Sequence, residues 1–166
     1  EPADYDATAE LSQDVGAGET EYSRYDRAVA EAASDWLSGR EAAHAPWAAF
    51  VSFVTPHYPL RAPAEFLDLY DPARIPPPVG HGPAMRPTHP ELAHIAGFYD
   101  YDRHFDAGRL AEARAAYFAL VSFMDRCVGR VLAALEASGQ AEETLVLYIS
   151  DHGEMLGDHG FWTKSV

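Results

Sequence analysis

Two short runs of apolar residues constrain the fold of this 166-residue chain more than any other feature. They cover residues 47–54 and 144–149, are rich in aromatic and β-branched side chains, and contain no charged residue. Unbroken apolar runs of this length are typical of strands that are buried on both faces, as in a parallel sheet. The first run ends before Pro56 and Pro59, which cannot donate hydrogen bonds to a neighbouring strand. We therefore predict two buried strands.

Amphipathic patterns accompany both runs. Apolar residues recur at helical spacing from Tyr25 to Leu37, and Gly39 follows as a helix stop. A stronger stripe at steps of three and four consists of Tyr117, Leu120, Val121, Met124, Val128, Val131, Leu132 and Leu135. Helices that alternate with apolar strands predict an α/β fold, with a mostly parallel sheet flanked by helices.

Two parts of the chain show no such pattern. Residues 1–22 are polar and acidic without a clear period, which predicts an irregular N-terminal segment. Residues 60–108 are dense in proline and form a long excursion between the expected elements. Long excursions in compact domains are often functional, so this one is either a substrate-facing insertion or an exposed connector.

Composition excludes some classes of protein. A formal net charge of −14 argues against nucleic acid as a partner, because no basic patch is present to neutralise phosphates. No run of about 18 apolar residues occurs, so we expect no membrane span. The N-terminus shows no signal peptide, which favours the cytoplasm without fixing the compartment. The missing initiator Met and the abrupt end at Val166 predict a piece of a longer protein.

Metal-ligating residue types follow the ends of both predicted strands. His57 comes after the first strand, and Asp151 and His152 come directly after the second. Ligands of open α/β sheets bind at the carboxyl ends of the strands, so these side chains are expected at one edge. Asp151 and His152 can reach one divalent ion if the backbone turns at Gly153. The alternative is structural, with Asp151 capping a turn and His152 bonded to a carbonyl.

These segments resemble a known family. Residues 147–164, which contain Ser-Asp-His-Gly-Glu and Gly-Asp-His-Gly, closely resemble the downstream metal-binding motif of the sulfatases, in the alkaline phosphatase superfamily. Residues 50–59 resemble a sulfatase segment in which a strand ends in a Pro-His pair, and residues 121–132 look like the intervening helix. The resemblance covers about residues 45–166. It implies that residues 1–166 are an incomplete, alkaline-phosphatase-like catalytic domain.

The resemblance also implies roles for single residues. Asp151 and His152 match a pair of metal ligands, while His57 and Lys164 match residues that contact the sulfate ester. The histidine of this pair, where many sulfatases have Asn, marks the subgroup of choline-sulfatase-like enzymes and phosphonate monoester hydrolases. The metal is expected to be Ca²⁺ or Mn²⁺, because a carboxylate oxygen suits either ion and imidazole favours manganese. The alternative for Lys164 is a solvated surface lysine. The alternative for His57 is a loop histidine without a role in catalysis.

Other parts of the family pattern are missing. Sulfatases form their nucleophile within Cys/Ser-x-Pro-x-Arg, and this motif does not occur here. Cys127 lacks the required proline and falls near the apolar stripe, so we interpret it as a core residue. The paired aspartates that complete the metal site are also missing. We therefore predict a sulfuric ester hydrolase of small sulfate esters whose activity is absent from this chain alone. The alternatives are a phosphate or phosphonate ester hydrolase and a non-catalytic relative.

Overall fold

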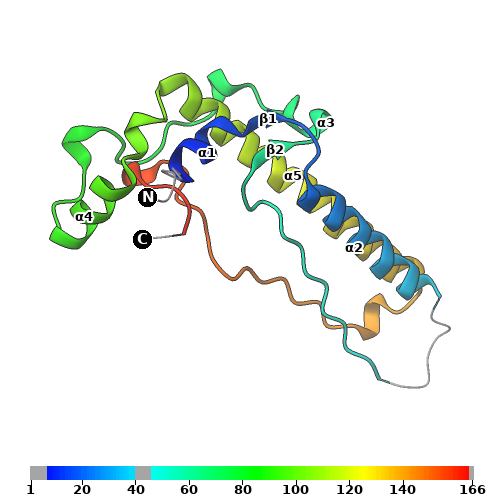
Figure 1. Ribbon diagram of the computed structural model, residues 1–166. Helices are drawn as coiled ribbons and strands as arrows, with labels where there is room; N and C mark the ends of the chain where they lie inside the picture. The colour runs from blue at the N-terminus through cyan, green and yellow to red at the C-terminus, as the bar shows by residue number, and fades with distance from the viewer. Residues whose placement is uncertain (1–6, 40–45, 165–166) are drawn as a thin grey trace, which may run out of the picture.

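The computed structural model describes residues 7–39 and 46–164 (Figure 1). In chain order, the helices and strands are α1 (Ala7–Gln13), β1 (Val15–Ala17), α2 (Glu21–Ser38), β2 (Leu60–Ala62), α3 (Ala64–Leu67), α4 (Pro90–Tyr99) and α5 (Ala107–Ala137). Single 3₁₀ turns lie at Pro72–Arg74 (η1), Pro83–Met85 (η2), Tyr101–Arg103 (η3), Ala141–Glu143 (η4) and Asp158–Gly160 (η5). No helix in the described ranges is both long and apolar enough to cross a membrane.

Two packed helices form the body of the molecule, with α2 lying along α5 (Figure 1). A capping box starts α2, because the Thr20 hydroxyl accepts from the Ser23 N–H and the Ser23 hydroxyl accepts from the Thr20 N–H. Gly39 follows its last residue, as the sequence predicts. The Asp106 side chain caps α5, which begins ten residues before the apolar stripe and contains all of it. Both predicted helices are confirmed.

The sheet is small and lies where no strand was expected. Strands β1 and β2 pair in parallel, with Val15 opposite Leu60 and Ala17 opposite Ala62. The prediction that residues 1–22 are irregular is therefore wrong for the described residues, which contain α1 and β1. A three-residue strand is too short to show a period-2 pattern, so only its partner across the fold reveals it. The α/β class is confirmed, with parallel strands flanked by helices.

The two predicted buried strands are a further correction. Residues 47–54 and 144–149 have no strand pairing and run as coil below α2 and α5 (Figure 1). Many of their apolar side chains face solvent, with Phe50 86% exposed, Leu147 77% and Ile149 78%, whereas Phe53 is partly buried against the core. A run becomes a strand only when at least one neighbouring strand pairs with its backbone N–H and C=O groups. The described residues provide no such neighbour for either run.

The core lies around the middle of α5. Ala113, Ala116 and Ala119 are fully buried on this helix, and their small side chains let β2 and α3 pack closely against it. Phe123 meets Phe66 of α3 edge to face at 5.5 Å between ring centroids. The same cluster includes Leu156 and Trp162, so the C-terminal loop is packed onto the core. That packing positions the candidate site.

Candidate functional site

His152 and Lys164 are brought into contact, although they are twelve positions apart in the chain. Nζ of Lys164 lies 3.3 Å from Nε2 of His152. On the other side of the ring, Nδ1 lies 2.9 Å from the Gly153 carbonyl oxygen. A carbonyl only accepts, so Nδ1 carries the ring hydrogen and Nε2 presents its lone pair. This is the tautomer that metal ligation through Nε2 requires.

Asp151 completes the pair of candidate ligands. Its Oδ1 accepts the N–H of His152 at 3.0 Å, and its Oδ2 lies 3.6 Å from Nε2 of the same residue. The two bonds expected if these residues were only structural are therefore present, one from the His152 N–H to Oδ1 of Asp151 and one from Nδ1 of His152 to a carbonyl. They leave Oδ2 of Asp151 and Nε2 of His152 facing one another. A carboxylate oxygen beside an imidazole nitrogen is a donor set that fits Mn²⁺, and the oxygen alone fits Ca²⁺. Within residues 7–39 and 46–164, no third His, Cys, Asp or Glu joins them.

Glu154 fixes the loop that carries Lys164. Its Oε1 accepts the N–H of Leu156 at 3.2 Å and also the N–H of Thr163, the residue before Lys164. Two backbone bonds close the same loop, from Met155 N–H to the Thr163 carbonyl and from Gly157 N–H to the Phe161 carbonyl. The lysine is thus held opposite His152 by a short closed loop.

The carboxyl group of Glu154 interacts electrostatically with both candidate histidines, His57 and His152. Burial raises the pKa of this carboxyl group, the two backbone N–H donors oppose the rise, and so do His152 and His57. Both imidazoles therefore lie within electrostatic range of one carboxylate. Burial also raises the pKa of Tyr101 and Tyr117, and the carboxylate of Glu154 adds to both shifts. Both phenol groups therefore keep their proton to a higher pH than an exposed tyrosine does.

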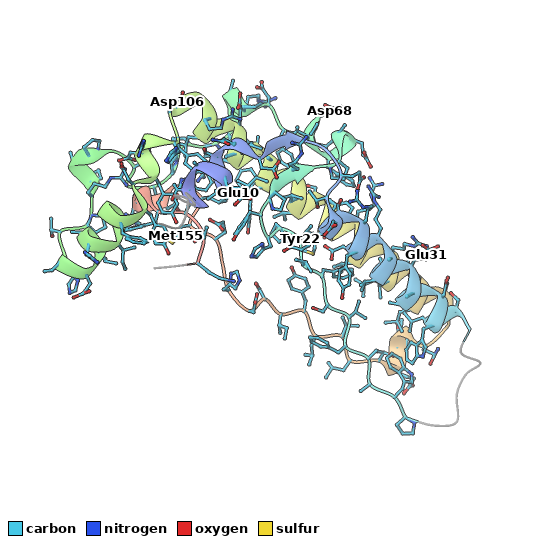
Figure 2. The ribbon with its side chains drawn as sticks, viewed as in Figure 1. Glu10, Tyr22, Glu31, Asp68, Asp106 and Met155 are labelled. Atoms are coloured by element: carbon cyan, nitrogen blue, oxygen red, sulfur yellow. The ribbon has the colours of Figure 1, made fainter. Side chains whose placement is uncertain are left out.

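His57 approaches from a separate part of the chain. Its Nδ1 donates to the Tyr58 carbonyl oxygen at 2.7 Å, so this ring also points Nε2 away from the backbone. The ring stacks on Tyr58 at 4.4 Å and meets the edge of Tyr22 at 5.8 Å between centroids. Tyr22 lies at the start of α2 (Figure 2). In the described residues no hydrogen bond joins His57 to Asp151, His152 or Lys164, so the structure brings together three of the four predicted residues and leaves His57 nearby.

The second Asp-His-Gly copy has a different role. It forms η5, where Oδ1 of Asp158 accepts the N–H of Val79 at 2.9 Å and the N–H of His159 donates to the Val79 carbonyl at 2.7 Å. Arg114 of α5 lies beside them, donating to the Pro76 carbonyl at 3.1 Å and to the Leu156 carbonyl at 2.5 Å. The proline-rich excursion is therefore attached to the site loop. Sequence reasoning missed Arg114, which looks like any other helical arginine.

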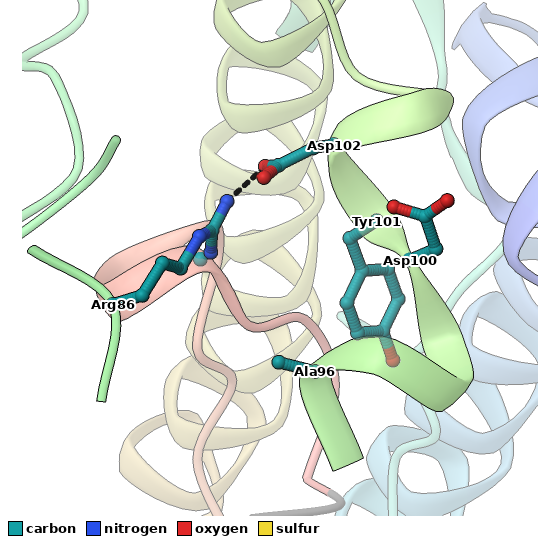
Figure 3. Close-up of a pocket in the computed structure, with 6 residues that line it drawn as sticks. Arg86, Ala96, Asp100, Tyr101 and Asp102 are labelled. Atoms are coloured by element: carbon teal, nitrogen blue, oxygen red, sulfur yellow. Dashed lines mark hydrogen bonds and ion pairs between the residues drawn. The ribbon is translucent and has the colours of Figure 1, made fainter. Parts of the chain in front are cut away.

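A small cavity lies behind this attachment (Figure 3). It is lined by Arg86, Ala96, Asp100, Tyr101, Asp102 and Gly160, and encloses about 30 Å³. Arg86 forms an ion pair with Asp102 and donates to the His159 carbonyl at 3.2 Å. Gly160 has a φ of 79°, and a Cβ there would lie 0.8 Å from a guanidinium nitrogen of Arg86. The cavity has room for about one water molecule and none for an ester.

Comparisons with known proteins identify the family of this chain. The sulfatase family model matches residues 2–165. Choline-sulfatase from Rhizobium meliloti is 38% identical over 122 residues, covering 72% of this chain and 23% of that protein. A multifunctional alkaline phosphatase superfamily protein from Trinickia caryophylli is 33% identical over 141 residues, covering 78% of this chain and 27% of that protein.

A solved structure has a similar fold. Phosphonate monoester hydrolase from Silicibacter pomeroyi is 31% identical, with a TM-score of 0.63, over 83% of this chain and 29% of that one. The chain spans about a quarter of the length of the curated relatives it matches. The family model, the relatives and the shared fold together lead to one conclusion: the chain belongs to the sulfatase family, in the alkaline phosphatase superfamily.

Proposed function

We propose that the intact protein containing this chain hydrolyses sulfate esters with a divalent metal ion, and that this chain is part of its catalytic domain. The observation that supports the proposal most is the convergence on Nε2 of His152. Oδ2 of Asp151 lies 3.6 Å from this atom and Nζ of Lys164 lies 3.3 Å from it. A pair of metal ligands and a cation suited to an anionic ester thus meet at one point.

The roles of the residues follow from their chemistry. Asp151 and His152 would hold the ion, either Ca²⁺ or Mn²⁺, which when bound polarises the ester and stabilises developing negative charge. Lys164 would donate to the non-bridging sulfate oxygens through its ammonium group. His57 would donate from Nε2 to the leaving oxygen, which requires the doubly protonated ring because Nδ1 is already bonded to a carbonyl.

Activity would belong to the intact protein and not to this chain alone. A sulfatase nucleophile is formed in Cys/Ser-x-Pro-x-Arg, and these 166 residues do not contain that motif. We expect the purified chain to show no metal-dependent turnover of an aryl sulfate. Measurable turnover that disappears on adding a chelator would contradict this expectation.

A phosphonate or phosphate ester is the second candidate substrate. It is supported by the likeness to phosphonate monoester hydrolase at a TM-score of 0.63. The ligands in this chain do not distinguish tetrahedral sulfur from phosphorus. Turnover by the intact enzyme of an aryl sulfate and of the matched aryl phosphonate and phosphate separates the two, because the true class gives the largest kcat/KM. No turnover of any of them would favour a non-catalytic relative.

The metal role is tested by Asp151→Asn in the intact enzyme. We expect bound metal to fall well below one equivalent, because the amide is a weaker ligand than the carboxylate, and kcat/KM to fall roughly 100-fold or more. Metal content by plasma mass spectrometry gives a readout that does not depend on activity. The matched control is Asp68→Asn, an exposed aspartate on the surface (Figure 2), which should change neither value. Full metal content in Asp151→Asn would overturn the proposed ligand role.

A further inference from the structure

A buried carboxylate on α2 holds the turn that presents His57. Asp26 is fully buried, at 0% exposure, and both of its oxygens accept hydrogen bonds. Oδ1 accepts the N–H of Val54 at 2.9 Å. Oδ2 accepts the N–H of Thr55 at 2.9 Å and the Thr55 hydroxyl at 2.5 Å. All three donors thus belong to residues two and three positions before His57.

These bonds compensate for an unfavourable burial. Taking a carboxylate out of water costs several kcal/mol unless charge-assisted hydrogen bonds replace its hydration. In the described part of the chain, the hydrogen-bond partners of Asp26 are these three donors, all from one turn. Because the same bonds that satisfy the carboxylate also fix the turn, a shift of the turn would leave a buried charge unsatisfied.

The constraint is passed on to His57 in two ways. The N–H of His57 donates to the Val54 carbonyl at 3.1 Å, so the turn that Asp26 holds also fixes the backbone of His57. Tyr22 lies four residues before Asp26, on the same face of α2, and its ring meets the His57 ring at 5.8 Å. One face of α2 therefore sets both the backbone position and the ring orientation of His57.

We propose that Asp26 is a positioning residue for His57, acting through the 54–57 turn to hold Nε2 toward the ester. The inference rests on the proposed ester-binding role of His57. It concerns a residue about thirty positions upstream, in a helix whose sequence shows only amphipathic spacing. A displacement of about 1 Å at a reacting group costs up to about 100-fold in rate, so the turn is a sensitive point of the site.

The test is a double-mutant cycle in the intact enzyme with an aryl sulfate as substrate. In Asp26→Asn the amide NH₂ replaces one acceptor oxygen and faces an N–H donor of the turn in either orientation, which loosens the turn. We expect kcat/KM to fall roughly 10- to 100-fold in the otherwise wild-type enzyme. In the His57→Ala background the same change should cause no further loss, because the residue that it positions is absent. The matched control, Asp35→Asn, removes an exposed aspartate from the same helix and should leave kcat/KM unchanged.

Thr55→Val provides a milder version of the same test. It removes only the hydroxyl bond to Asp26, so we expect a loss of a few-fold with the same dependence on His57. If Asp26→Asn does not fold, as judged by circular dichroism, this variant decides the question. Equal losses in the two backgrounds, or no loss from Thr55→Val, would overturn the positioning role alone. An unchanged kcat/KM in His57→Ala would instead overturn the proposed role of His57 and the inference with it.

Discussion

At the scale of single residues, the two candidate histidines have the same hydrogen-bond arrangement at Nδ1. In His57 and in His152, Nδ1 donates to the carbonyl of a neighbouring residue, at 2.7 and 2.9 Å. The ring hydrogen is thereby fixed, and Nε2 is left for the site in both cases. The consequences differ, since a metal ligand needs the lone pair of Nε2 whereas a donor to an ester needs a second proton there.

Lys164 is expected to bind substrate and not metal. In the intact enzyme, Lys164→Met should lower kcat/KM for an aryl sulfate roughly 10- to 1,000-fold, because a preorganised cation at the sulfate oxygens is lost. Bound metal should stay at the wild-type level, because an ammonium group has no lone pair to offer. Steady-state kinetics with metal analysis measures both, and a parallel fall in metal content would contradict this separation of roles.

Cys127 is expected to be inert. It is 5% exposed on α5, and its burial raises the pKa of the thiol, with a further rise from the charge of Asp26. Less thiolate is therefore present at a given pH than in an exposed cysteine. Iodoacetamide at pH 8 should label Cys127 slowly in the native enzyme and fully after denaturation, as followed by peptide mass spectrometry. Rapid native labelling would contradict its place in the core.

At the scale of elements, the long helices α2 and α5 are predicted from local sequence spacing, whereas the short helices α1, α3 and α4 and the sheet are not. Gly39 ends α2, as the sequence predicts. The start at Thr20 falls in residues 1–22, which the pattern predicts to be irregular, although its capping contact with Ser23 is local. Strand β1 pairs with a strand 45 residues away, Val15 with Leu60, and its local sequence, Val-Gly-Ala, does not predict this pairing. The candidate site divides in the same way. Asp151, His152 and Lys164 lie in one motif, whereas Asp26 is recognised only once the fold brings it to residue 54.

The attachment of the excursion to the site loop depends on Arg114. Its bonds to Pro76 and Leu156 are made by a nearly buried guanidinium, and such charged bonds contribute about 1.5–3 kcal/mol each. Arg114→Met should therefore speed hydrogen exchange at the amides of Val79 and His159 roughly 10-fold or more, measured by mass spectrometry. Arg109→Met changes a half-exposed arginine of the same helix and should leave these amides protected. Unchanged exchange in Arg114→Met would contradict the attachment.

At the scale of the whole molecule, the exposed apolar runs are the main departure from an ordinary surface. Leu145, Leu147 and Ile149 are each more than three-quarters exposed and alternate along an extended segment. Contiguous apolar surface of this kind marks a contact face. Since the chain spans about a quarter of the length of its relatives, we expect residues 47–54 and 144–149 to pair with strands from the rest of the intact protein.

Charged substitutions in residues 144–149 should improve the solution behaviour of the isolated chain but prevent folding of the intact enzyme. In the isolated chain, Leu147→Lys with Ile149→Lys should reduce dye binding to apolar surface and self-association, because exposed apolar area is removed. In the intact enzyme the same pair should prevent folding, because unpaired charges would be buried. Leu69→Lys, at an isolated position that is 65% exposed, should be tolerated in both. Tolerance of the double substitution by the active intact enzyme would show that these runs are not interior.

The closed loop beneath Lys164 has a consequence for how such a centre is inherited. Because Glu154 accepts the backbone N–H groups of Leu156 and Thr163, the distance from His152 to Lys164 is set within the thirteen residues 152–164. Recombination that exchanges this stretch as a block would transplant the metal pair and the lysine with their spacing intact. His57 would not be transferred with this block, because its position depends on α2, which is encoded in a different part of the sequence.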